Sequence, residues 1–200
     1  MLAETEDTWG GIFANSARSY LEPTLVLFSG STSSACGFAA AATGPFYCPD
    51  DHQIYIDLSF YDELVRRFWA PGDFAQAYVL AHEVGHHVQQ ILGVLGGQRA
   101  AAAGVEANCV SIQIELQADC YAGVWAYYAN ADGLLEIGDL DEAMNAAAQV
   151  GDDAIQLRER GYVVPESFNH GSSEQRARWF LRGYESGDPN RCDTFSATAL

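Results

Sequence analysis

The chain has 200 residues, a length that suits one domain spanning residues 1–200 with a buried core. Its 48% hydrophobic content excludes a disordered chain. Its net charge of −17, with no lysine, argues against nucleic acid or an anionic membrane surface as a partner. The simplest explanation of this charge is a solubilising surface, and the alternative is an acidic rim that selects basic substrates.

The N-terminal third of the sequence predicts short helices and a small sheet. Residues 5–20 have the aromatic and apolar spacing of a helix. Residues 24–28 and 53–57 are short runs typical of strands, separated by loops rich in glycine, serine and proline. Residues 62–69 predict a short helix that ends before Pro71.

A long helix is predicted from Asp73, which can cap it, to Leu92, after which Gly93 ends it. This helix is apolar on several sides, as is typical of a helix in a protein core. Two histidines and a glutamate lie within it, and their burial would be costly unless they are paired or bind a metal.

The second half of the chain predicts more helices. One covers residues 105–130, and another covers residues 140–160 with a break near Gly151. A final helix begins where Ser172 and Gln175 have the spacing of a capping box. The predicted fold class is therefore α+β, mainly helical, with the small sheet on the N-terminal side.

The segment His82-Glu83-Val84-Gly85-His86 is the H-E-x-x-H signature of zinc peptidases. On a helix, His82 and His86 project from one face and can bind the same metal ion. Glu83 lies one position further round, where its carboxylate can act as the general base on a water at the metal. The motif predicts one catalytic zinc ion.

A catalytic zinc has three protein ligands and an open position, so a third ligand is needed. We expect Glu115, because Asp119 follows four residues later on the same helical face. A carboxylate there can accept the second ring N–H of a ligating histidine and fix its tautomer. The alternative is a solvated helix face, but the neighbouring Ile112, Ile114 and Leu116 favour a buried role.

A peptidase of this kind needs a hydrogen-bond donor for the oxyanion that develops beside the metal. His170 is our candidate, because it lies in a glycine-flanked loop just before a capped helix. The alternative is a loop histidine that only hydrogen-bonds the backbone. Tyr121, Tyr47 and Tyr55 are weaker candidates for the same role.

The other histidines and the helical cysteines are expected to be structural. His87 points about 100° away from the ligand face, so we expect it in the core or behind a ligand. His52 is expected at the surface, beside two aspartates. Cys109 and Cys120 point well away from Glu115 around one helix and cannot share a site with it.

The five cysteines allow two disulfides. Cys36 and Cys48 flank a short loop that a disulfide could close. If Cys109 and Cys120 lie on one helix, they are ~16 Å apart, which is too far for a bond. Cys192 then pairs with one of them, and one thiol stays free. Two disulfides would imply an oxidising compartment.

Together these motifs resemble the YpfJ-like family of neutral zinc metallopeptidases, and the resemblance covers nearly the whole chain. The matching segments are CGFAAAATGPFYCP (36–49), GDFAQAYVLAHEVGHHVQ (72–89), ELQADCYAGVWA (115–126), GDD (151–153), FNHGSSEQRARWF (168–180) and CDTF (192–195).

The resemblance implies a zincin-like domain of the gluzincin type, in which His82, His86 and Glu115 hold zinc and Glu83 activates water. It also implies a bacterial, extracytoplasmic protein, secreted or anchored in the cell envelope. Members carry an N-terminal hydrophobic anchor, so we expect any membrane tether to lie in a segment that this sequence does not contain. With this resemblance, geometry favours a Cys120–Cys192 disulfide and a free Cys109.

We therefore expect a zinc-dependent peptidase that acts on a peptide or protein substrate. In zincins the substrate lies along an edge strand, and residues 53–57 are our candidate for that strand. The main alternative is a catalytically inactive, zinc-stabilised envelope domain that binds a protein partner. A third hypothesis is a metal-dependent hydrolase that acts on a non-peptide amide.

Overall fold

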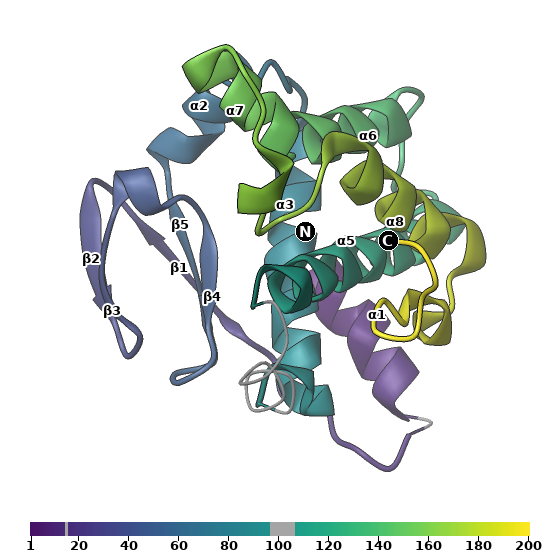
Figure 1. The fold of residues 1–200 in the computed structure, drawn as a ribbon. Helices are drawn as coiled ribbons and strands as arrows, with labels where there is room; N and C mark the ends of the chain where they lie inside the picture. Colours follow the sequence, from purple (N-terminus) through teal and green to yellow (C-terminus); the bar gives the residue numbers. More distant parts are fainter. Residues whose placement is uncertain (15, 97–106) are drawn as a thin grey trace.

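Helices make up most of the residues that the computed structural model describes, which are 1–14, 16–96 and 107–200. The described helices are α1 (Leu2–Ala14), α2 (Ser59–Arg66), α3 (Asp73–Leu92), α5 (Ala107–Ala131), α6 (Asp139–Gln149), α7 (Asp152–Arg160) and α8 (Ser173–Ser186). Short 3₁₀ turns are η1 (Ala41–Thr43), η3 (Pro165–Ser167) and η4 (Pro189–Cys192). The mainly helical composition with a small β region confirms the predicted fold class at this level (Figure 1).

The strands form one three-stranded sheet and one hairpin. They are β1 (Thr24–Phe28), β2 (Ser31–Ser34), β3 (Gly37–Ala40), β4 (Phe46–Cys48) and β5 (Gln53–Asp57). The sheet has the order β1-β5-β4, in which β5 is parallel to β1 and antiparallel to β4. The hairpin pairs β2 with β3.

The prediction that residues 53–57 form an edge strand is wrong. This segment is β5, which has a hydrogen-bonded neighbour on each side. Its Ile54 and Ile56 are fully buried, as is typical of a central strand. The edge strand whose residues line the cleft described below is β4. The sequence did not predict β2 and β3, because their serines, alanines and glycine lack strand propensity. It did not predict β4 because this strand has only three residues.

The early helices differ from prediction at their ends. Helix α1 stops at Ala14, where a turn from the Ser16 N–H to the Phe13 carbonyl replaces the expected continuation to residue 20. Helix α2 begins at Ser59, three residues earlier than expected. Asp57 causes this early start, because its carboxylate accepts both the backbone N–H and the hydroxyl of Ser59.

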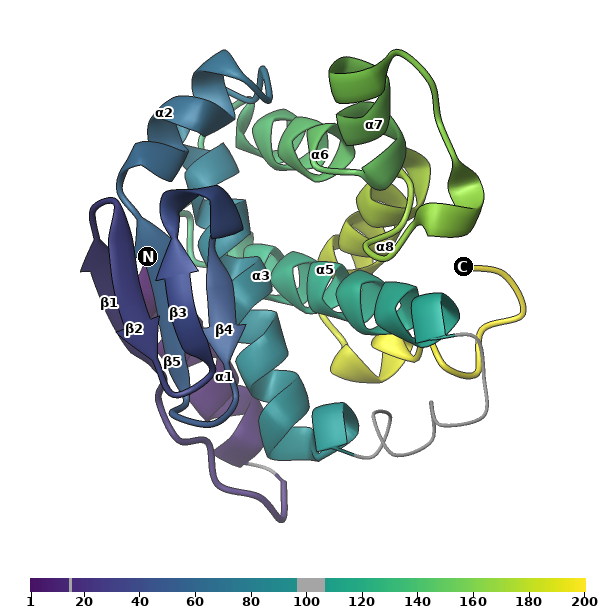
Figure 2. The same cartoon turned by 60° about the vertical axis from the view of Figure 1, so that its left-hand side comes forward.

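Helix α3 is the predicted long helix, and it runs through the middle of the molecule. In two views the strands lie to one side of α3, and α6 and α8 lie to the other side (Figures 1 and 2). Asp73 is its first residue and makes no side-chain cap, contrary to expectation. Glu142 of α6 takes that role, because its carboxylate accepts the Phe74 N–H at 3.2 Å.

The predicted break near Gly151 and the predicted capping box are confirmed. Helices α6 and α7 separate at Gly151, where a Cβ atom would lie 2.3 Å from the Ser173 backbone nitrogen. At the start of α8, the Ser172 hydroxyl accepts the Gln175 N–H, and the Gln175 side chain accepts the Ser172 N–H. These contacts fix the position of the loop that precedes α8.

Two groups of buried side chains form the interior. The helical core includes Phe74, Tyr78, Trp125 and Phe180. The sheet-side core includes Trp9, Ile54, Ile56, Val84 and Trp179. Both groups contain residues of α3 and α5, which therefore join them.

Both expected disulfides are present. Cys36 is bonded to Cys48, Cys120 of α5 is bonded to Cys192 of η4, and Cys109 is free. Such bonds are typical of oxidising compartments. Within the described residues, the helices are too short or too polar to cross a bilayer.

Removing the Cys120–Cys192 bond should lower stability strongly, because the bond closes a loop with a sequence separation of 72. Loop-closure entropy predicts a loss of about 4 kcal/mol in the double variant Cys120→Ser/Cys192→Ser. Calorimetry should show a melting temperature lower by roughly 10 °C. Cys109→Ser is the matched control and should melt like the wild type. An unchanged melting temperature in the double variant would contradict this prediction.

Candidate metal centre

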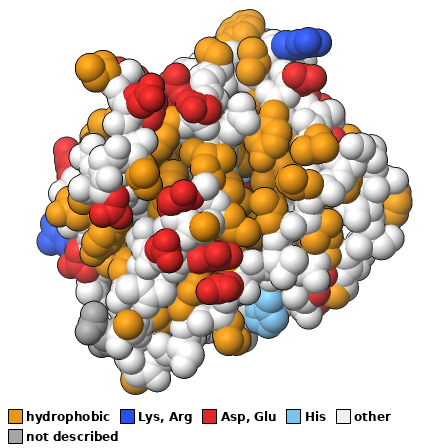
Figure 3. Space-filling view, turned by 180° about the vertical axis from the view of Figure 1, so that it is seen from behind, with side chains coloured by type: hydrophobic (Ala, Val, Ile, Leu, Met, Phe, Trp, Pro, Cys, Tyr) orange, Lys and Arg blue, Asp and Glu red, His pale blue; other side chains and the backbone are white. Residues whose placement is uncertain are grey.

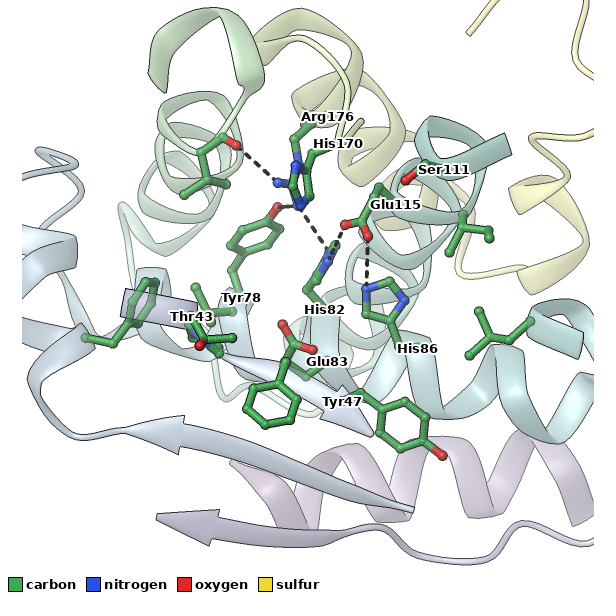
Figure 4. Close-up of a pocket in the computed structure, with 18 of the residues that line it drawn as sticks. Thr43, Tyr47, Tyr78, His82, Glu83, His86, Ser111, Glu115, His170 and Arg176 are labelled. Atoms are coloured by element: carbon green, nitrogen blue, oxygen red, sulfur yellow. Dashed lines mark hydrogen bonds and ion pairs between the residues drawn. The ribbon is translucent and has the colours of Figure 1, made fainter. Parts of the chain in front are cut away.

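Helices α3 and α5 approach each other closely at the H-E-x-x-H motif. A Cβ atom on Gly85 would lie 2.8 Å from the backbone carbonyl oxygen of Ala118, so only glycine permits this approach. The close approach brings the face of α3 that carries His82 and His86 against the face of α5 that carries Glu115 (Figure 4).

His82, His86 and Glu115 converge on one point. The Nε2 atom of His82 lies 3.2 Å from one Glu115 carboxylate oxygen, and that of His86 lies 3.6 Å from the other. One ligand atom from each residue lies within 4.8 Å of the others. Two ligands of one tetrahedral zinc ion are roughly 3.3 Å apart, so the spacing suits a single ion.

Each of the two candidate ligand histidines has a fixed acceptor for its Nδ1–H group. The Nδ1–H of His82 donates to Asp119 at 2.8 Å, and the Nδ1–H of His86 donates to the Gln89 side-chain oxygen at 2.9 Å. Gln89 is itself oriented, because its NH₂ group donates to the Ile114 carbonyl and to Gln117. Both Nε2 lone pairs are thereby free for a metal. The sequence did not reveal Gln89, although it lies three residues after His86.

The charges around the ligands favour a cation. Burial lowers the pKa of His82, but Asp119 and Glu115 outweigh this effect and raise it to about 10. Burial also lowers the pKa of His86, but the Glu115 carboxylate outweighs this effect and raises it above its usual value. Burial raises the pKa of Glu115, but the two histidines hold it well below its usual range. A site that stabilises positive charge in this way suits a divalent ion.

Glu83 is buried beside these ligands, and its Oε2 atom has no hydrogen-bond partner among the described residues. Burial raises the pKa of its carboxyl group, against the opposing effect of the two histidines. A buried carboxylate oxygen without a partner is unusual. A role as general base, in which the oxygen accepts a proton from water, would explain it. Two imidazoles, one carboxylate and this free base together fit a catalytic zinc site.

Asp119 is the centre of a buried network that the sequence only partly revealed. Arg176 of α8 donates to both Asp119 oxygens at 2.9 Å, and the Tyr78 hydroxyl donates to one of them at 2.6 Å. Burial raises the pKa of Asp119, but Arg176 and His82 lower it below the usual value. Arg176 precedes Phe180 by one helical turn on the buried face of α8, and this spacing was the available signal.

His170 lines the same cleft, and Asp152 holds its loop in place. One oxygen of Asp152 accepts the backbone N–H groups of Asn169, His170 and Gly171 at 2.7, 2.7 and 3.1 Å. The other oxygen lies 3.3 Å from Nδ1 of His170. The His170 side chain is 49% exposed, so its Nε2 atom remains accessible to a ligand. Asp152 lies in the matching segment 151–153, but no sequence pattern indicated its contact with the His170 loop.

The tyrosines considered as alternatives to His170 have other contacts. The Tyr47 hydroxyl lies between His52 and His87, at 3.1 and 3.0 Å from their Nδ1 atoms. Tyr55 donates its hydroxyl to a loop aspartate, and Tyr121 lies in the sheet-side core. His87 is fully buried and His52 is exposed, as predicted.

A second group of acidic side chains is formed by Asp73, Asp139 and Glu142, whose carboxylates also approach one another. Glu142 already caps α3, and Asp139 accepts the N–H of Glu136. These contacts give the group a structural role at the ends of two helices.

The cleft over the candidate metal centre has a volume of about 640 Å³. Among the described residues that line it, the acidic ones are Glu83 and Glu115, which both belong to the centre. Elsewhere acidic side chains are spread over the surface, as on the face in Figure 3. This distribution favours a solubilising role for the negative charge over an acidic rim.

Comparisons with known proteins agree with this geometry. Residues 1–195 match the family described as "putative neutral zinc metallopeptidase". The chain is 52% identical to YpfJ of Escherichia coli strain K12 over 98% of this chain and 69% of that protein. It is 48% identical to Rv2575 of Mycobacterium tuberculosis strain H37Rv, over 90% of this chain and 65% of that protein. No solved structure matches it. The chain therefore belongs to the family described as "putative neutral zinc metallopeptidase", and YpfJ is one of its relatives.

Proposed function

We propose that this chain is a zinc-dependent peptidase with a zincin-like active site. This proposal rests on one observation: a set of metal ligands and a buried general base lie together at one point. Three side chains offer a His, His, Glu ligand set, and the Oε2 atom of the buried Glu83 beside them lacks a hydrogen-bond partner among the described residues. A purely structural zinc site has no use for such a base and is usually closed by a fourth protein ligand.

A zinc ion bound by His82, His86 and Glu115 would polarise the scissile carbonyl and lower the pKa of a water molecule. Glu83 accepts the proton of the attacking water and later delivers it to the leaving amine. Burial raises the pKa of the Glu83 carboxyl group, which makes it a stronger base toward the attacking water. Asp119 and Gln89 keep the two histidines in the tautomer that presents Nε2.

His170 donates a hydrogen bond from Nε2 to the oxyanion of the tetrahedral intermediate. Asp152 supports this role, because one of its oxygens lies 3.3 Å from Nδ1 of His170 and the other accepts backbone N–H groups of the loop. A donor fixed in this way needs little reorganisation during the reaction.

The substrate backbone lies along β4, the edge strand. Phe46 and Tyr47 of this strand line the cleft, so its free edge can pair with an extended peptide. We propose an extracytoplasmic location, because the two disulfides require an oxidising environment to form.

Zinc depletion and restoration test this function. The purified chain should cleave peptides, lose activity with a chelator and regain it with one equivalent of zinc. Simple amides should react far more slowly, because they lack the backbone that pairs with β4. Efficient cleavage of simple amides alone would favour a non-peptide hydrolase. Firm zinc binding without any cleavage would favour a domain that binds a protein partner.

His170→Ala should lower kcat about 10²- to 10³-fold while zinc affinity stays unchanged, because one oxyanion donor is removed. The matched control is His52→Ala, which removes an exposed histidine that does not line the cleft. Steady-state kinetics with zinc titration measure both properties. Loss of zinc in His170→Ala would mean that His170 is a ligand.

A further inference from the structure

One side of the cleft consists of apolar side chains from several elements, which we call the apolar wall. Its members are Phe60 of α2, Tyr78 and Val79 of α3, Val150 between α6 and α7, and Ile155 of α7. All five belong to the helical core or pack against it. Tyr47 and Leu95, which also line the cleft, belong to the sheet-side core. The wall therefore lies on the side of the cleft that the helical core forms.

The apolar wall adjoins the reacting groups directly. Tyr78 lies one helical turn before His82, and Val79 lies one turn before Glu83. The rings of Tyr78 and His82 have centroids 6.2 Å apart. Figure 4 shows Tyr78 on one side of His82 and His86 on the other. A peptide whose scissile carbonyl lies at the metal would therefore place a neighbouring side chain against this wall.

The apolar wall offers no free charge to that side chain. The Tyr78 hydroxyl, its polar group, already donates to Asp119. Arg176, which also lines the cleft, already donates hydrogen bonds to Asp119, Tyr78 and the Val150 carbonyl. Burial of an uncompensated charged side chain here would be costly, whereas an apolar one would gain free energy.

We propose that the apolar wall is a specificity pocket that takes a large aliphatic or aromatic side chain from the residue next to the scissile bond. This inference rests on the proposed peptidase function and names its substrate class. The cleft volume of about 640 Å³ leaves room for such a side chain beside the peptide backbone. Apolar residues at this position should be preferred over charged ones by at least about 10-fold in kcat/KM.

The test compares three zinc-loaded proteins: the wild type, Ile155→Lys and Leu157→Lys. Ile155 lines the cleft, whereas Leu157 lies on the same helix, is 59% exposed and does not line it. Both variants add one positive charge to α7, so Leu157→Lys is the matched control. Each protein is given a library of proteome-derived peptides, and the cleavage sites are identified by mass spectrometry.

We expect leucine, isoleucine, phenylalanine or similar residues at one position next to the cleaved bond. Ile155→Lys should reduce this preference at least about 10-fold, and Leu157→Lys should leave it unchanged. A preference for basic residues, or the same preference in Ile155→Lys as in the wild type, would overturn the inference.

A binding measurement separates this inference from the proposed function. Leucine, phenylalanine, lysine and aspartate hydroxamates share a zinc-binding group and differ in their side chain. Calorimetric titration of the zinc-loaded protein should give tighter binding of the leucine and phenylalanine compounds, with the difference reduced in Ile155→Lys. Equal affinities would overturn the apolar wall as a pocket even if peptides are cleaved. Apolar selectivity without any cleavage would support the pocket and contradict the peptidase. Ile155→Ala repeats the test if Ile155→Lys does not fold.

Discussion

Glu83→Gln is expected to lower kcat about 10²- to 10⁴-fold while the protein keeps its zinc. Glutamine has the shape of glutamate but cannot accept a proton from water, and Glu83 is not one of the three converging ligands. Its carboxylate is buried, and within the part of the chain that the structure describes Oε2 has no hydrogen-bond partner, so a neutral amide should not destabilise the fold. We therefore expect an unchanged zinc content and a melting temperature no lower than that of the wild type.

Steady-state kinetics, elemental analysis and thermal melts check this prediction on the same samples. Glu63→Gln serves as control, since it removes an exposed carboxylate of α2 that pairs with Arg67 and does not line the cleft. It should have wild-type activity. Full hydrolysis by Glu83→Gln would refute the proposed mechanism, and loss of zinc would show that Glu83 is a ligand.

Asp119→Asn should weaken both the fold and the metal site. Asp119 is fully buried and forms an ion pair with Arg176, so its neutralisation removes the directly paired counter-charge of a buried guanidinium. Loss of one partner of a buried pair costs about 3–5 kcal/mol. Asp119 also accepts the His82 Nδ1–H, and loss of such a partner lowers metal affinity about 10- to 100-fold.

Two further variants separate these effects. Tyr78→Phe removes one neutral hydrogen bond to Asp119 and should cost only about 1 kcal/mol. The double variant Asp119→Leu/Arg176→Met removes the whole buried pair, so it should recover most of the stability but not the zinc affinity. Denaturation curves and zinc titrations measure the two quantities. Wild-type zinc affinity in Asp119→Asn would show that Asp119 does not support the metal site.

The parts of the fold that sequence patterns predicted are those with strong local signals. Helix α3 has continuous apolar character and ends at Gly93, which adopts a left-handed conformation. The capping box at Ser172 and the break at Gly151 depend on single residues with a clear conformational role. The strands β2, β3 and β4 were missed, because each has only three or four residues and is stabilised by pairing with a neighbouring strand.

The residues of the candidate site also divide into those with a local sequence signal and those without one. His82, Glu83 and His86 were identifiable because a helical repeat relates them within five residues. Gln89 and Arg176 were not identified, because ordinary glutamines and arginines lie on helix surfaces and only tertiary packing buries these two. The edge strand was misassigned, because the order of strands in a sheet depends on connections that the sequence does not display.

Zinc content per chain, measured together with peptide cleavage, tests the central claim most directly. The samples are the wild type, Glu115→Ala and Asp139→Asn, the last from the second acidic group. We predict one zinc in the wild type and in Asp139→Asn, with cleavage that a chelator abolishes. Glu115→Ala should lack both zinc and cleavage. Zinc retained in Glu115→Ala, or one firmly bound zinc in a wild type that cleaves no peptide, would contradict the account.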